Sequence, residues 1–141
     1  MTAVDLAEKK SRMRAMSFYL FSALSLALLW LSMVRPDSDF LRGMWLGLTF
    51  TAALNLLPIL RWLRPRSAVW RLLDDDGVRE HRRMACTAGF WAGVAAAFAV
   101  AVATEFVAAI TPFDAVRVVA TASIAAALLC FATLELRAQR G

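Results

Sequence analysis

The sequence predicts an all-α membrane protein whose four transmembrane helices form two antiparallel hairpins. Apolar residues make up 60% of its 141 residues, whereas soluble domains average about 45–50%. Four apolar windows approach the roughly 20 residues that a helix needs to cross about 30 Å of hydrocarbon. Basic residues flank these windows instead of spreading over a polar surface. The net charge of +5 therefore indicates a membrane surface and no direct binding of nucleic acid.

The four windows are residues 15–34, 43–60, 84–104 and 118–134, and they divide the chain into five parts. These are a tail at 1–14, a first hairpin at 15–60, a linker at 61–83, a second hairpin at 84–134 and a tail at 135–141. The first window contains no ionisable residue and exceeds the roughly 7–15 apolar residues of a secretory signal. We therefore expect it to be retained as a membrane span.

The first hairpin turns at Pro36, which cannot continue a helix, and the Asp and Ser residues after it can accept the free N–H groups of the next helix. Span two opens with Gly43 and Gly47, whose spacing permits close approach of a neighbouring backbone. It ends with Asn55, a polar candidate for bonding across to another helix, and with Pro58, where we expect a kink.

The second hairpin contains a stripe of small residues and a turn. Ala85, Gly89, Gly93, Ala97 and Ala101 recur at every fourth position of span three, so we expect this face to pack against another helix. The residues 111–114 carry a turn and a capping signal before span four. Arg117 then lets that span start near the interface.

The linker at 61–83 contains seven of the sixteen Lys and Arg residues. Its first half has the pattern of a short interfacial helix, and from Val78 a helix can run directly into span three. The two tails and the linker hold thirteen Lys and Arg residues, against three in the other connections. The positive-inside rule therefore predicts that the linker and both termini are cytoplasmic, in a bacterial inner membrane.

Polar residues outside the spans form no catalytic, cofactor or metal pattern. His81 stands among Glu80, Arg82 and Arg83 without further His or Cys ligands nearby, so we expect a solvated interfacial side chain. Glu105 lies at the last turn of span three, where a wet position is expected. Inside the spans, the remaining candidates are the thiols of Cys86 and Cys130, which we expect to be reduced and to act as small apolar groups.

The region from Leu73 to Trp91 resembles a loosely defined group of uncharacterised small bacterial four-span membrane proteins. In that group an acidic pair, a basic turn and a Gly-aromatic-Trp step lead into the third span, as do Asp74-Asp75-Asp76, Arg79-Glu80-His81-Arg82-Arg83 and Gly89-Phe90-Trp91 here. This chain has Asp76-Gly77-Val78 where members often have Glu-Leu-Thr. Some members are encoded beside helix-turn-helix transcription regulators, so the resemblance implies a membrane partner that restrains such a regulator.

The sequence thus predicts a non-enzymatic membrane interaction or regulatory protein, without a cofactor, that contacts the lipid bilayer and a cytoplasmic protein. The candidate partner-binding residues are Asp74, Asp75, Asp76, Arg79, Arg82 and Arg83. The candidate helix-packing residues, within one chain or in a homo-oligomer, are Gly43, Gly47, Asn55, Gly89, Gly93 and Ala97. The alternative is a small transporter or transporter subunit that uses Asn55, Pro58 and Glu105.

Overall fold

The computed structural model describes residues 3–35, 38–56, 76–107 and 110–138. These residues form four helices: α1 (Ala3–Val34), α2 (Asp39–Leu56), α4 (Asp76–Phe106) and α5 (Pro112–Ala138). The predicted all-helical fold is confirmed for this part of the chain. The expected interfacial helix in the linker and the kink at Pro58 lie outside the described residues.

Three helices are long and apolar enough to cross a membrane, at Glu8–Val34, Gly77–Phe106 and Pro112–Ala138. The prediction of a membrane protein with transmembrane helices is thereby supported. The described 18 residues of α2 do not qualify. They include Asp39, Arg42 and Asn55, whose polar side chains lower the hydropathy of a short helix.

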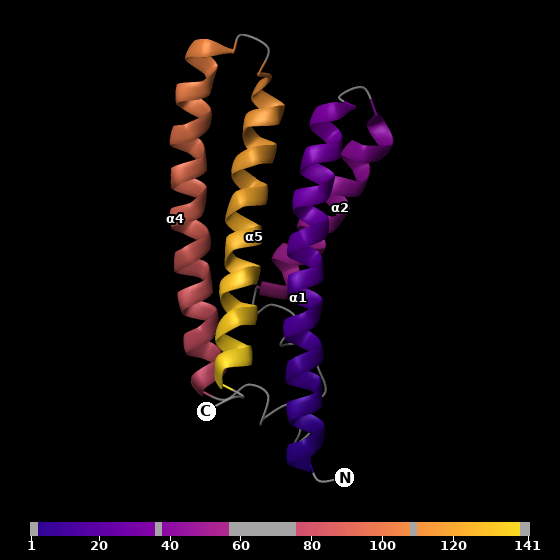
Figure 1. The fold of residues 1–141 in the computed structure, drawn as a ribbon, viewed down its shortest axis with the longest axis vertical. Coiled ribbons are helices and arrows are strands. Elements are labelled where there is room, and N and C mark those ends of the chain that lie inside the picture. Colours follow the sequence, from indigo (N-terminus) through magenta and orange to yellow (C-terminus); the bar gives the residue numbers. More distant parts are fainter. Residues whose placement is uncertain (1–2, 36–37, 57–75, 108–109, 139–141) are drawn as a thin grey trace.

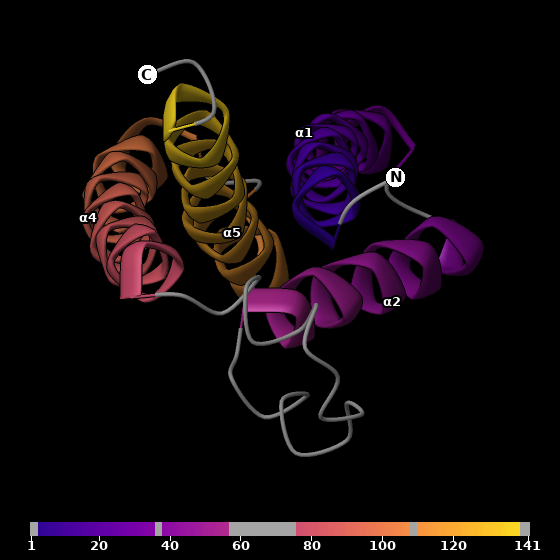
Figure 2. The ribbon, with the colours of Figure 1, turned by 90° about the horizontal axis from the view of Figure 1, so that it is seen from below.

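Helix α5 is the centre of the bundle. Figure 1 shows α5 running between α4 and α1 in the direction opposite to both. It contacts each of the other three helices, and α1 packs more extensively on α5 than on α2. Seen from below, α2 runs obliquely across the bundle with its last turn toward α5 (Figure 2). Both chain ends lie at the same end of the bundle (Figure 1).

Two helix starts follow the predicted capping chemistry. The Ser38 hydroxyl accepts the Leu41 N–H at 3.3 Å, just before α2. The Thr111 hydroxyl accepts the Asp114 N–H at 3.2 Å and donates to the Asp114 carboxylate at 2.6 Å. Pro112 then occupies the first position of α5, where a missing N–H costs no hydrogen bond.

The helices extend beyond the apolar windows. Residues 3–14, predicted as a tail, belong to α1, and residues 76–83 of the predicted linker belong to α4. Toward the C-terminus, α5 continues to Ala138, past the expected end of span four at residue 134. Charged residues with long side chains are good helix formers, so polarity alone does not end a helix.

The contact between α4 and α5 depends on two of the glycines in the small-residue stripe. A β-carbon at Gly89 would lie 2.7 Å from the Ser123 carbonyl oxygen and 2.9 Å from the Ala127 β-carbon. One at Gly93 would overlap the Ser123 hydroxyl. Further along the stripe, Ala97 is exposed. The close approach therefore involves the first half of the span and ends before Ala97.

The contact between α1 and α5 uses a face of α1 that carries three buried serines. Ser22, Ser25 and Ser32 are each at most 2% exposed. The Ser25 and Ser32 hydroxyls donate to carbonyls of their own helix, Phe21 at 2.8 Å and Leu29 at 2.7 Å. The Ser22 hydroxyl donates to the Ala125 carbonyl of α5 at 3.4 Å. Small hydroxyl side chains thus bring the two backbones together while their own polar groups stay paired.

The glycine pair of α2 makes no comparable contact within the chain. Gly43 and Gly47 are exposed, and a β-carbon at either would have nothing within 4 Å. Their spacing therefore serves no close helix contact among the described residues of this chain.

We predict that Gly89→Val lowers the free energy of unfolding by about 1–3 kcal/mol, because the new side chain would force α4 away from Ser123 and Ala127. Gly47→Val is the matched control, since the same change there meets open space. Unfolding in mixed micelles, followed by circular dichroism as the denaturing detergent is increased, measures both. Equal losses in the two variants would contradict the packing described here.

Candidate functional site

Glu135 is the centre of a charged cluster at the end of the bundle where the two termini lie. It belongs to α5 and is 4% exposed. Its Oε1 atom accepts a hydrogen bond from the Ser11 hydroxyl at 2.5 Å and forms an ion pair with the Arg14 guanidinium. Both partners come from α1. Residue 135 was expected to begin the C-terminal tail, and the structure instead buries it between helices. A carboxylate removed from water requires a cation and hydrogen-bond donors, which Arg14 and Ser11 supply.

His81 of α4 lies on the other side of the same carboxylate. Its Nδ1 atom is 3.5 Å from Glu135 Oε2, and its side chain is 20% exposed. Neither of these two buried atoms has a hydrogen-bond partner among the described residues. The histidine that was expected to be solvated is only partly exposed, and its Nδ1 atom faces the Glu135 carboxylate of α5. One carboxylate thus contacts groups from both α1 and α4.

Arg14 also packs against an aromatic ring of α5. Its guanidinium lies 5.2 Å from the centre of the Phe131 ring, which in turn packs on Phe18 at a centroid distance of 5.2 Å. A planar cation over an aromatic face keeps a favourable electrostatic contact while it is partly removed from water. The ion pair and the aromatic contact together hold the first half of α1 on the last turns of α5.

A pocket of about 340 Å³ adjoins this cluster. Arg14, Ser17, Asn55 and Arg82 contribute polar groups to its wall, and Phe18 and Phe21 are among its apolar residues. These side chains come from α1, α2 and α4. The pocket therefore combines two cations with aromatic surface, a composition suited to an anionic ligand that also has an apolar part.

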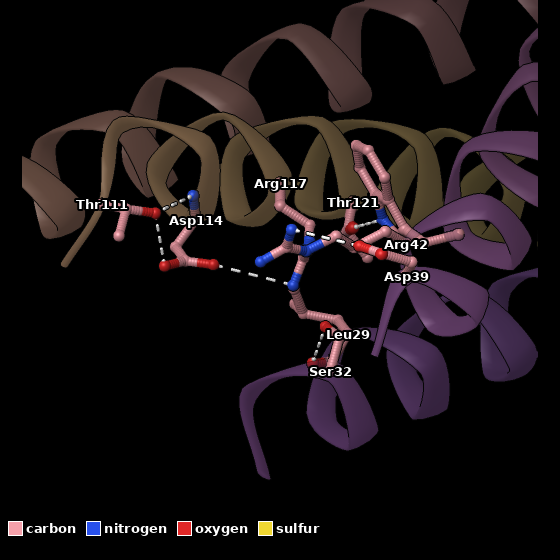
Figure 3. A network of polar contacts seen from close by, with 9 residues as sticks. Leu29, Ser32, Asp39, Arg42, Thr111, Asp114, Arg117 and Thr121 are labelled. Carbon is pink, nitrogen blue, oxygen red and sulfur yellow. Dashed lines mark hydrogen bonds and ion pairs between the residues drawn. The ribbon is translucent and has the colours of Figure 1, made fainter. Parts of the chain in front are cut away.

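A second buried charge lies on α5 near its other end. Arg117 is 2% exposed and forms an ion pair with Asp114 at 3.6 Å (Figure 3). Its guanidinium lies 4.6 Å from the centre of the Phe113 ring and 5.7 Å from that of Trp45. The Trp45 indole N–H donates to the Thr121 hydroxyl at 2.9 Å. The expected interfacial Arg117 is instead enclosed, and its ring contacts attach α2 to α5.

The predicted partner-binding residues separate into exposed and enclosed ones. Asp74 and Asp75 lie outside the described residues, and Asp76 is the first residue of α4. Arg79 and Arg83 are exposed, one turn apart on α4. In contrast, Arg82 is partly buried and lines the pocket. The arginines therefore do not form one surface.

Two of the three residues proposed for transport, Asn55 and Glu105, do not come together, and Pro58 lies outside the described residues. Asn55 donates to the Thr51 carbonyl of its own helix at 2.8 Å and lines the pocket. Glu105 is exposed in the last turn of α4, at the opposite end of that helix from Arg82 (Figure 1). Cys86 is exposed and Cys130 partly buried, and both are free thiols. Within the described ranges, no three His, Cys, Asp or Glu residues are placed to hold a metal ion.

The sequence did not lead us to expect that Glu135 and His81 contact each other, although the helical face on which each lies is visible in the sequence. The every-fourth-residue stripe of α4, extended backward by one step from Ala85, reaches His81. The buried face of α5 passes through Thr121, Ala125, Leu128 and Ala132 and arrives at Glu135. Both helical faces continue beyond the apolar windows, so the polar residues just outside a window can still lie on a packed face.

No protein-family model, curated protein or solved structure matches this chain.

We predict that Glu135→Gln destabilises the protein by about 3 kcal/mol, because it leaves the partly buried Arg14 without its counter-ion. The double variant Arg14→Gln/Glu135→Gln should lose less than the two single changes together. Asp39→Asn is the control: its carboxylate is 94% exposed beside Arg42, so its loss should cost less than about 1 kcal/mol. Detergent unfolding measures all four variants. Additive losses for Arg14 and Glu135 would show that the two side chains are not coupled.

Proposed function

We propose that this chain is a non-enzymatic protein of the bacterial inner membrane that binds and restrains a cytoplasmic protein. The observation that carries the proposal is the position of Arg79 and Arg83. Residues four apart share one face of a helix, and both are exposed, while α4 packs on α5 through the face that holds Ala85 and Gly89. Two cations on the outer face of α4 suit an acidic surface of a partner.

Charge asymmetry supports the proposed orientation. Thirteen of the sixteen Lys and Arg residues fall in the two tails and the linker, and both termini lie at the end of the bundle from which α4 starts (Figure 1). The positive-inside rule places that end in the cytoplasm. In this arrangement residues 43–60 form a fourth span, paired with residues 15–34 as the first of two hairpins. The arginines of α4 then face the compartment where a regulator would be found.

The resemblance of residues 73–91 to small four-span proteins suggests what kind of protein the partner is. Some members of that group are encoded beside helix-turn-helix regulators, so we propose a transcription regulator as the restrained protein. Asp74, Asp75 and Asp76 would add negative charge next to the arginines. Such a mixed surface fixes the orientation of a partner more than it adds affinity. Exposed Gly43 and Gly47 remain available for contact with a second copy of the chain.

We predict that Arg79→Ala/Arg83→Ala lowers recovery of the cytoplasmic partner on the order of tenfold, because each of the two exposed charge pairs is worth about 0.7 kcal/mol. The measurement compares the proteins captured from cytosol by the full chain in lipid nanodiscs. Lys9→Ala/Arg12→Ala is the matched control, since it removes two exposed cations from the same end of the bundle. A partner bound equally by all three proteins would place the binding surface elsewhere.

A further inference from the structure

The pocket beside Glu135 is lined by cations. Its two arginines are Arg14 and Arg82, and no acidic side chain is among its described lining residues. The carboxylate of Glu135 pairs with Arg14. The Nε atom of Arg14 is buried without a hydrogen-bond partner among the described residues. A phosphodiester carries a single negative charge at neutral pH and accepts the planar, paired hydrogen bonds that guanidinium groups donate.

The size and the apolar wall of the pocket restrict the ligand further. About 340 Å³ is at the lower end of the range for small-molecule sites, enough for a glycerophosphate headgroup but not for a whole lipid. Phe18 and Phe21 give the wall an aromatic side, and Phe21 is only partly buried. Neighbouring residues of α1, including Leu20 and Leu24, are exposed on a helix that can span the bilayer. Acyl chains attached to a bound headgroup could therefore continue along α1 into lipid.

We propose that this pocket binds the headgroup of an anionic phospholipid, with its phosphodiester between Arg14 and Arg82. Its wall includes Arg82, near the start of α4, and Phe131, near the end of α5, so the pocket lies toward the proposed cytoplasmic end of the bundle. Basic pockets between membrane helices on that side are suited to acidic headgroups, because the cytoplasmic leaflet carries negative charge. Asn55 adds an amide to the wall from α2. The bound lipid would thus contact α1, α2 and α4 together.

Native mass spectrometry of the full chain, delipidated in a neutral detergent, tests this site. Phosphatidylglycerol should bind about tenfold more tightly than phosphatidylcholine with the same acyl chains, and Arg82→Gln should remove that preference. Arg83→Gln is the matched control: it removes the same charge from the adjacent residue, whose side chain is 81% exposed, and should change affinity less than about twofold. Circular dichroism verifies that each variant is folded.

Three outcomes would overturn the proposal. Equal affinity for the two lipids would show that the pocket does not recognise negative charge. Equal weakening by Arg82→Gln and Arg83→Gln would mean attraction to the basic surface alone. Complete displacement of the lipid by equimolar glycerol 3-phosphate would identify a water-soluble phosphate as the ligand. Asn55→Leu gives a second test that leaves all charges in place, and it should weaken phosphatidylglycerol binding about threefold.

Discussion

A charged side chain of a membrane helix must be enclosed and partnered, and this requirement determines how α5 meets its neighbours. Arg117 and Glu135 are both almost completely buried. They are separated by about 27 Å along a helix that rises about 1.5 Å per residue, close to the thickness of a hydrocarbon core of about 30 Å. Each charge therefore lies near one edge of the apolar length of α5. Neither can face lipid there without a large desolvation cost.

The partners of these two charges come from different helices. Arg117 is enclosed by the Trp45 ring of α2 and by Phe113 of its own helix. Glu135 is held by Arg14 of α1, with His81 of α4 beside it. Between the two ends, small residues bring the backbones together: Gly89 on α4, and the buried serines on α1. Buried ion pairs add little net stability, so we assign the pair of Arg14 and Glu135 mainly to selecting which helices pack and in what register.

The sequence was sufficient for the helical fold and for the way α4 packs, but not for the charged cluster. Apolar length and composition identify α1, α4 and α5 as candidate spans, and the spacing of Gly89 and Gly93 identifies the face of α4 that meets α5. The expected role of Gly43 and Gly47 depended on spacing alone, and spacing does not reveal whether a neighbour is present. The contact of Glu135 with Arg14 joins opposite ends of the chain. The helical faces of α4 and α5 indicate that His81 and Glu135 lie on packed surfaces, but the pairing with Arg14 depends on how the helices are arranged relative to one another.

The most direct test of this account is the depth of α4 in a bilayer. Nitroxide labels at Arg83, Ala95 and Glu105, in a variant with Cys86 and Cys130 replaced by alanine, report access to oxygen in lipid and to a nickel complex in water. All three labelled positions are exposed on α4. We predict that Ala95 is accessible to oxygen but protected from nickel, and that the other two positions show the reverse. Nickel access at Ala95 equal to that at Arg83 would contradict a hydrocarbon environment around the bundle.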